Sequence, residues 1–210
     1  RASGQPRAAR NRPAPARSVS ARLPQAAALV LALLLGGCAP LMPVDAPLAA
    51  TRVAAPAFEL SGRVSASDGV QAASGNLEWQ HAHGRDQWTV STPLGQILAR
   101  LDSTPAGAQL QSADGSRLHA ASAQDLLPQV LGIDAPVDRL AQWVQATPAA
   151  DAEVRLRDAH GRPALVIDQG WRIEYAAYAD EGAQAPPLRI DVSRGDARLR
   201  LIIDHWQTAP

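Results

Sequence analysis

From residue 57 onward, the chain repeats one pattern: short runs in which apolar and polar residues alternate, separated by turns that contain glycine. Leu77 and Trp79 alternate with polar neighbours, and the same alternation returns near the end of the chain at Leu199, Leu201 and Ile203. Successive side chains of a strand point to opposite faces of a sheet, so a period of two places the apolar residues on one face. The pattern therefore predicts antiparallel strands with one buried face and one face in water.

Eleven such runs are expected to be strands, six before residue 122 and five after residue 146. Asp68-Gly69 and His83-Gly84 are typical of tight hairpin turns. Tight turns make strands that follow each other in the chain neighbours in the sheet. The predicted fold is therefore mainly β, a meander that has to curl in order to cover its own apolar face.

Between the two groups of strands, the apolar residues recur with the period of a helix. Ser122 is a typical helix N-cap and Gly132 a typical C-cap, and Pro128 is expected to shorten or kink the helix between them. Pro136 predicts the start of a second helix over residues 137–145, whose apolar side chains share one face. Two short helices within a long run of strands predict a lid or plug across the sheet.

The second face of the predicted strands is made of Arg, Glu, Asp, Gln and Ser, and aromatic residues form only 4% of the chain. A transmembrane barrel would instead carry an apolar band toward the lipid, with aromatic girdles. The sheet is therefore expected to be soluble, with an apolar interior. Periodicity leaves open whether that interior is a packed core or a ligand cavity.

The start of the chain has the composition of an export signal. Residues 1–22 hold six arginines and no acidic residue, and residues 26–35 are an uncharged apolar run that is too short to span a bilayer. The following Leu35-Gly36-Gly37-Cys38 is typical of a bacterial lipobox, in which the thiol receives a diacylglyceryl group and the signal is removed. We expect a lipoprotein signal peptide over 1–37 and lipidation at Cys38; the alternative is a chance cysteine after an ordinary signal peptide.

Residues 38–56 are rich in proline and alanine and show no periodicity, which predicts a tether between the lipidated cysteine and a domain over 57–210. Without the first 37 residues, the chain has fourteen arginines and twenty acidic residues, a net charge of −6. Proteins that bind phosphate backbones carry clustered cations, so nucleic acid is not an expected partner.

The sequence contains none of the common enzyme motifs: no P-loop, no Gly-x-Gly-x-x-Gly, no Gly-x-Ser-x-Gly and no paired carboxylates. His81 and His83 are spaced as in some metal sites, but no second group of ligands accompanies them. We therefore predict no enzyme, no metal site, and no cofactor apart from the covalent diacylglyceryl and N-acyl groups at Cys38.

The turn expected at residues 91–96 holds Leu94 between Pro93 and Gly95. Leucine is unusual in a solvated turn, where polar residues dominate. Either Leu94 folds back onto the edge of the sheet, or it projects from the loop tip and touches a membrane. Single exposed apolar residues are common, so the spacing alone does not decide.

Short motifs follow one another in order over nearly the whole predicted domain. They are Phe58-x-Leu-x-Gly-Arg63, Gly75-Asn-Leu-x-Trp79, Thr92-Pro-Leu-Gly95, Leu126-Leu127 through Leu131-Gly132, Pro136-Val-x-x-Leu-x-x-Trp-Val144, Gly170-Trp-x-Ile-x-Tyr175, Pro187-Leu-Arg-Ile190 and Leu199-x-Leu-Ile-Ile-Asp-x-Trp206. Together with the lipobox, this series resembles the LolB family of outer-membrane lipoprotein receptors. One departure is Gln145-Ala-Thr-Pro148, which stands where a glycine is expected after the second helix.

The resemblance implies an unclosed antiparallel β-barrel of about eleven strands, with short α-helices as a lid over an apolar cavity. It implies a protein that is lipid-anchored in the outer membrane and faces the periplasm. There it would accept acylated lipoprotein clients from a LolA-like periplasmic carrier and insert them into the outer-membrane lipid. A monomer is expected. The rival is a non-catalytic scaffold lipoprotein for envelope assembly, with a packed β core.

The resemblance also assigns roles to residues. Leu94, with Pro93 and Gly95, matches the family's membrane-insertion loop. The inward positions of the strands and helices are the candidate lining of the acyl-binding cavity: Phe58, Leu60, Leu77, Trp79, Trp88, Val90, Ile97, Leu101, Leu127, Val130, Leu140 and Trp143.

Overall fold

The computed structural model describes residues 48–208. The predicted signal peptide and the lipidation site Cys38 lie outside the described residues. Within them, eleven strands form one antiparallel sheet, which confirms the fold class. The strands are β1 (Ala57–Ser67), β2 (Ala72–Ala82), β3 (Arg85–Ser91), β4 (Ile97–Thr104), β5 (Gly107–Ser112), β6 (Arg117–Ala120), β7 (Glu153–Arg157), β8 (Pro163–Asp168), β9 (Trp171–Tyr178), β10 (Pro187–Arg194) and β11 (Ala197–Thr208).

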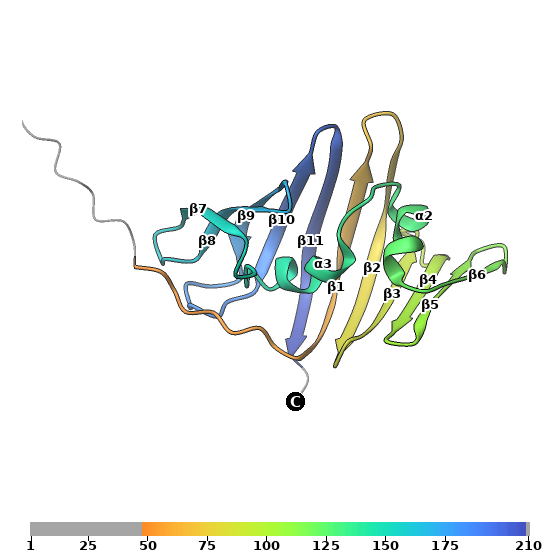
Figure 1. The fold of residues 1–210 in the computed structure, drawn as a ribbon, viewed down its shortest axis with the longest axis horizontal. Coiled ribbons are helices and arrows are strands. Elements are labelled where there is room, and N and C mark those ends of the chain that lie inside the picture. Colours follow the sequence, from red (N-terminus) through yellow and green to blue (C-terminus); the bar gives the residue numbers. More distant parts are fainter. Residues whose placement is uncertain (1–47, 209–210) are drawn as a thin grey trace, which may run out of the picture. The chain divides into compact units, whose positions relative to one another are not determined.

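Neighbours in the sheet are neighbours in the chain except at the centre, where β1 pairs with β11 (Figure 1). The strands β6 and β7 form the two edges of the sheet and do not pair with each other, so the sheet stays unclosed. The segment between these two strands contains the helices. The chain therefore crosses from one edge of the sheet to the other through its lid.

The junction of β1 with β11 depends on Gly62. A bulge shifts the register of this pair between Ser61 and Gly62, and a Cβ atom on Gly62 would lie 2.0 Å from the carbonyl oxygen of Ile202. Only glycine permits two backbones to approach this closely. The glycine of the first sequence motif thus sits where the two halves of the sheet join.

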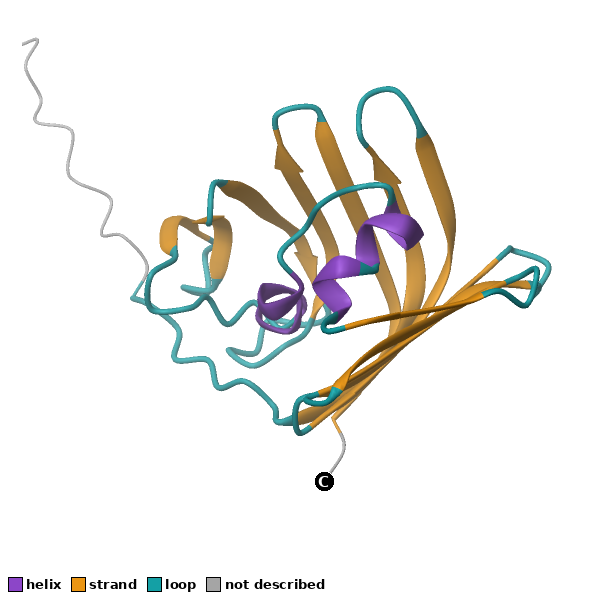
Figure 2. Ribbon diagram, turned by 45° about the vertical axis from the view of Figure 1, so that its right-hand side comes forward, coloured by secondary structure: helices purple, strands orange, loops and turns teal. Residues whose placement is uncertain are grey.

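One face of the sheet is apolar and curves around the helices (Figure 2). Along β1, Leu60 and Val64 are buried, whereas Glu59 and Arg63 on the opposite face are exposed. Burying a leucine or valine side chain contributes about 1.5–3 kcal/mol, so a sheet with this many apolar residues on one face requires a cover. The helices supply that cover.

The cover consists of a single turn of 3₁₀ helix, η2 (Ala123–Asp125), and two α-helices, α2 (Leu127–Leu131) and α3 (Val137–Val144). Pro128 lies in the first turn of α2, so it shortens the helix and does not kink it, and Gly132 ends α2 with φ of 70° as a C-cap glycine. Ser122 precedes η2 but caps no backbone amide; its hydroxyl donates to Asp125 instead. Within residues 48–208, none of the helices has the length and apolar character needed to cross a bilayer.

Residues 48–56, predicted to be part of the tether, lie along the domain (orange in Figure 1). The amide of Ala50 donates to the carbonyl of Gly161, with N and O 2.9 Å apart. The guanidinium of Arg52 donates to three backbone carbonyls, at Ala183, Gln145 and Ala185, over 2.6, 2.7 and 3.0 Å. The folded domain therefore begins before residue 57. The described end of the predicted tether is hydrogen-bonded to the surface of the domain.

Candidate functional site

An apolar cavity of about 60 Å³ lies between the curved sheet and the two α-helices. Its wall is entirely hydrophobic: Val64, Leu77, Trp79, Trp88, Val90, Leu101, Leu127, Val130, Leu131, Leu140, Val144, Leu199 and Leu201. Eight of the twelve residues predicted to line a cavity lie on this wall. The interior thus combines the two alternatives left open by periodicity, because a small cavity sits within a packed core.

Phe58 and Leu60 are on the same face of β1 as the cavity but do not line it. They are buried nearer the start of the strand, where the ring of Phe58 stacks on Trp206 and packs edge-on against Trp79, with centroids 4.7 and 5.1 Å apart. Each such aromatic pair contributes about 0.5–1.5 kcal/mol beyond burial. At this end the interior is packed, and Phe58 and Leu60 belong to the core beside the cavity.

Ile97 does not line the cavity either, because β4 is bulged. The ladder pairs Ser91 with Ile97 but Val90 with Ala99, so Leu98 is the extra residue. One extra residue turns the preceding side chain to the opposite face. Ile97 is therefore 48% exposed in a surface depression that it shares with Arg100, and Leu98 faces the apolar side in its place.

Trp143 is buried behind the cavity and not on its wall. Its indole Nε1 donates to Asp168 Oδ2 over 2.7 Å, and both side chains are almost fully buried. The same helix, α3, presents Arg139, whose guanidinium donates to both carboxylate oxygens of Asp151 at 2.9 and 2.8 Å. Hydrogen bonding to Asp151 raises the pKa of Arg139, and the same contact lowers the pKa of Asp151. Trp143 thus anchors the lid to the sheet.

The loop after β3 presents Leu94 to solvent. The amide of Thr92 donates to the carbonyl of Gln96, and that of Gly95 to the carbonyl of Thr92, at 2.8 and 2.9 Å. Gly95 has φ of 86°, a conformation that favours glycine. These bonds close the turn with the leucine side chain outside it, 94% exposed. Leu94 therefore does not fold back onto the sheet.

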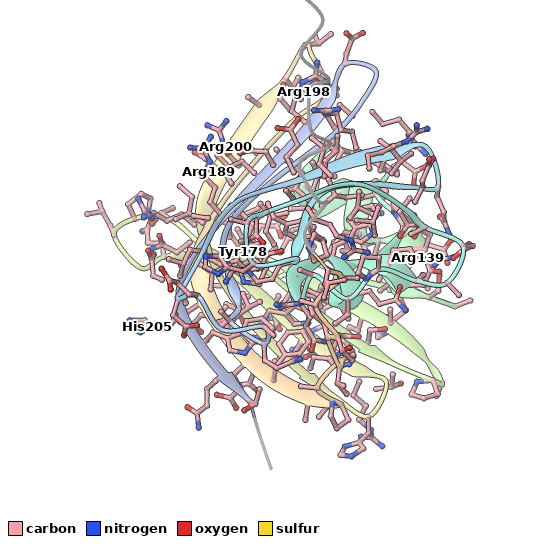
Figure 3. The ribbon with its side chains drawn as sticks, turned by 90° about the vertical axis from the view of Figure 1, so that its left-hand side faces the viewer. Arg139, Tyr178, Arg189, Arg198, Arg200 and His205 are labelled. Carbon is pink, nitrogen blue, oxygen red and sulfur yellow. The ribbon has the colours of Figure 1, made fainter. Side chains whose placement is uncertain are left out.

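The convex face of the sheet is polar, as the alternation predicts. Arg189 and Arg200, which are labelled in Figure 3, lie on this face. They flank Asp191, with 2.9 Å between Arg189 Nε and Asp191 Oδ2. Partial burial acts to raise the pKa of Asp191, but hydrogen bonds from the two arginines outweigh it and lower that pKa. These three side chains form solvent-exposed ion pairs on the outer face and do not face the cavity.

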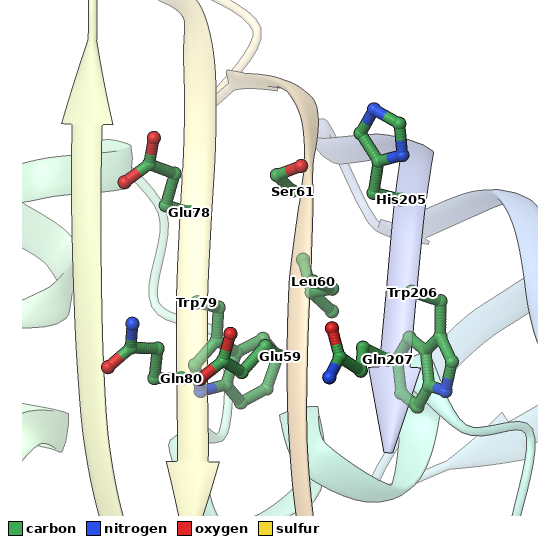
Figure 4. Close-up of a pocket in the computed structure, with 9 residues that line it drawn as sticks. All are labelled: Glu59, Leu60, Ser61, Glu78, Trp79, Gln80, His205, Trp206 and Gln207. Carbon is green, nitrogen blue, oxygen red and sulfur yellow. The ribbon is translucent and has the colours of Figure 1, made fainter. Parts of the chain in front are cut away.

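A pocket of about 400 Å³ lies on this outer face over β1, β2 and β11 (Figure 4). It contains Ser61 and His205, which are paired across the two strands, and two glutamates, Glu59 and Glu78. Among the described residues, no hydrogen bond joins the serine to the histidine. His81, part of the pair considered for metal binding, is instead 2.7 Å from a carboxylate oxygen of Asp86, and His83 lies in the next turn.

The family model for the outer membrane lipoprotein LolB matches residues 56–206. The chain belongs to the LolB family. An outer-membrane lipoprotein LolB of Azoarcus sp. (strain BH72) is 55% identical over 182 residues, which cover 87% of this chain and 94% of that protein. The LolB of Thiobacillus denitrificans is 40% identical over 183 residues, 86% of this chain and 95% of its own length. A solved LolA superfamily protein from Nitrosomonas europaea aligns with a TM-score of 0.45 and 11% identity, over 76% of this chain and 89% of that one.

After α3, Ala146 stands in the segment where the resemblance predicts a glycine. Ala146 is fully buried and adopts the left-handed conformation, with φ of 50°. That conformation costs a residue with a Cβ atom about 1–2 kcal/mol. The neighbouring Gln145 is fixed by its side chain, whose Oε1 accepts from the amide of Ala55 at 2.7 Å and whose Nε2 donates to the carbonyl of Ala141 at 3.1 Å.

Besides the buried bond between Trp143 and Asp168, sequence reasoning missed two features of this LolB-family domain. The first is Leu98, for which the bulge leaves no local signal. The second is Arg52, which also lies 5.4 Å from the ring centre of Tyr178, on whose ring Arg162 stacks at 4.1 Å. Burial raises the pKa of Tyr178, whose hydroxyl donates to the carbonyl of Pro163. The sequence offers one signal for these contacts of Arg52: it is a single arginine in a segment rich in proline and alanine.

Proposed function

We propose that this protein accepts acylated lipoproteins from a LolA-like periplasmic carrier, covers their acyl chains in its cavity, and inserts them into the outer membrane. The observation that carries the proposal is the all-apolar cavity wall beneath a helical lid, on a domain of the LolB family. The task is physical transfer and requires no bond chemistry.

The energetics favour a covered route. Each methylene that leaves water for an apolar site gains about 0.8 kcal/mol, so exposing a set of acyl chains would cost on the order of tens of kcal/mol. An apolar cavity lowers this barrier between the carrier and the bilayer. The direction of transfer is then set by the site in which the acyl chains have the lowest free energy.

The lid has to move for this task. The cavity of about 60 Å³ is far smaller than the roughly 300–1,000 Å³ of typical ligand sites. The described conformation is therefore the closed one, and acyl chains would take the place of the α2 side chains that now fill the interior. Val130, Leu131 and Leu127 are the side chains of α2 on the cavity wall.

Leu94 is the residue we assign to delivery, together with Pro93 and Gly95, which shape its loop. Its side chain is 94% exposed, and moving a leucine into lipid gains about 1.5–3 kcal/mol. Lipidation at Cys38 and the tether that follows would hold the domain at the periplasmic face of the outer membrane, so that the same bilayer anchors the receptor and receives the client. We propose that the protein acts as a monomer.

The test is transfer of a radiolabelled lipoprotein from its carrier to the acylated protein in liposomes. The unmodified protein should accept one client per molecule and pass it to the lipid. Leu94→Glu should accept the client but deliver it at least about tenfold more slowly, because a charge is expelled from the bilayer. The matched control is Val70→Glu, since Val70 is 90% exposed in a different turn and should deliver normally.

Equal delivery by the two variants would overturn the role of Leu94. Failure of the unmodified protein to accept any client would overturn the receptor itself and favour the scaffold alternative, in which the interior is only a core.

A further inference from the structure

A second space of about 170 Å³, lined mostly by apolar residues with Ser74, Ser112 and Gln129 among them, opens beside the cavity where the sheet has a gap. The ladder between β2 and β3 ends at Asn76 and Ser91, whereas β2 continues its pairing with β1 as far as Ala72. Beyond Ser91 the chain turns away through the loop of Leu94. The first residues of β2, before Asn76, therefore border an opening in place of a neighbouring strand.

The two sides of this opening differ in the size of their side chains. On the β1 and β2 side stand Ala66, Ala73 and Ser74, which leave the space wide. On the other side stand Leu98 and Leu110, and α2 closes the top with Val130 and Leu131. The opening is thus a mostly apolar groove, and one of its walls is formed by helix α2.

The groove and the cavity share part of their walls. Val64, Val90, Val130 and Leu131 line both spaces, so no layer of other side chains separates them. Two of the four belong to α2. Displacement of α2 would therefore enlarge the cavity and the groove at once and merge them into one channel.

The bulge in β4 places Leu98 at the outer lip of the groove. The side chain is 41% exposed, although it belongs to the apolar face. It follows the fully exposed Leu94 by four residues on the same loop and strand. Leu98 is thus a partly exposed apolar side chain that lies in the sequence between the exposed Leu94 and the rest of β4, and it lines the groove.

We infer that this groove is the portal through which acyl chains pass between the cavity and the bilayer, and that Leu98 forms its lip. The occupant is the saturated chain of an acylated client, because the lining offers shape and apolar surface but few groups that could bind a charge. This inference rests on the proposed function and adds the route to it.

Ile97 and Leu98 provide a matched pair for the test. They are adjacent and almost equally exposed, at 48% and 41%, but they face opposite sides of the sheet. The measurement is the rate at which a naturally fluorescent fatty acid binds residues 38–210 carrying Cys38→Ser, followed by stopped-flow fluorescence. Leu98→Glu should slow uptake about tenfold, the effect of a charge that costs roughly 1.4 kcal/mol at the lip. Ile97→Glu should leave uptake unchanged.

The outcomes separate the two proposals. If the unsubstituted protein shows no saturable binding, the receptor function fails and the portal with it. If that protein binds but both glutamate variants take up the probe at equal rates, the portal is wrong and the receptor function stands. A photoreactive residue at position 98, compared with one at 97, supplies a second readout: only position 98 should cross-link the fatty acid, and equal cross-linking would also contradict the portal.

Discussion

The two α-helices that cover the apolar face of the sheet are held by different means. Helix α3 is fixed by polar contacts: Trp143 donates to the buried Asp168, and Arg139 forms a two-pronged ion pair with Asp151. Helix α2 makes no side-chain hydrogen bond to any described residue and is held by apolar packing alone. Five residues are also far too few for a helix that is stable by itself.

Under the proposed function, this difference indicates which of the two helices moves. Hydrogen bonds are directional and break over short distances, whereas apolar contacts can be exchanged for an acyl chain with little change in free energy. Both the cavity and the groove are roofed by α2. The helix that would have to move is therefore the one whose contacts a lipid can replace, and α3 serves as its fixed neighbour.

The largest expected effect comes from breaking the anchor of α3. Asp168→Ala leaves the indole N–H of Trp143 buried without an acceptor and should lower the free energy of unfolding by roughly 3 kcal/mol. Urea unfolding followed by tryptophan fluorescence measures this loss. Asp168→Asn keeps an acceptor and should lose clearly less. Equal losses in the two variants would mean that packing, and not the hydrogen bond, holds α3.

A smaller effect should appear when the end of α2 is strained. Gly132 has φ of 70° and open space where a Cβ would stand, so Gly132→Ala adds no clash and costs about 1 kcal/mol of backbone strain. Hydrogen exchange should then quicken several-fold in the amides of α2, while those of α3 stay as they were. The control is Gly195→Ala in the turn between β10 and β11, where φ is 58° and space is also open. Faster exchange in α3 as well would show that the two helices open together.

The same contrast explains what the sequence could and could not predict. Period and turn chemistry sufficed for the eleven strands, for α3 starting after Pro136, and for Gly132 as the end of α2. Each of these depends on residues near one another in the chain. The exposure of Leu94 also follows locally, from the glycine turn that contains it.

Features that depend on distant partners escaped prediction. The bulge at Leu98 is an adjustment of β4 to β3, and it reverses the face of Ile97 without any change in the pattern of residues. The partners of Arg52 are carbonyl groups, which every residue carries, at positions 93 to 133 residues further along the chain. The buried bond between Trp143 and Asp168 likewise joins two elements whose approach only the folded sheet defines.

The smallest expected effect concerns acid, and it should weaken α3 without affecting the contacts of α2. Hydrogen bonding from Arg139 lowers the pKa of Asp151 below its ordinary value of about 3.9. A group whose pKa is lower in the folded state stabilises the fold above its unfolded pKa, and this contribution is lost as the pH falls toward the folded pKa. The exposed pair should therefore contribute a small stabilisation at neutral pH that disappears below about pH 4.

The measurement is the urea midpoint of the unmodified protein and of Asp151→Asn at successive pH values. Other carboxylates, such as Asp158 and Asp191, also have lowered pKa values, so both proteins should lose stability in acid. The difference between the two midpoints isolates Asp151: it should be present at neutral pH and vanish in acid, and a difference that persisted in acid would place the effect of Asp151 outside its ion pair with α3.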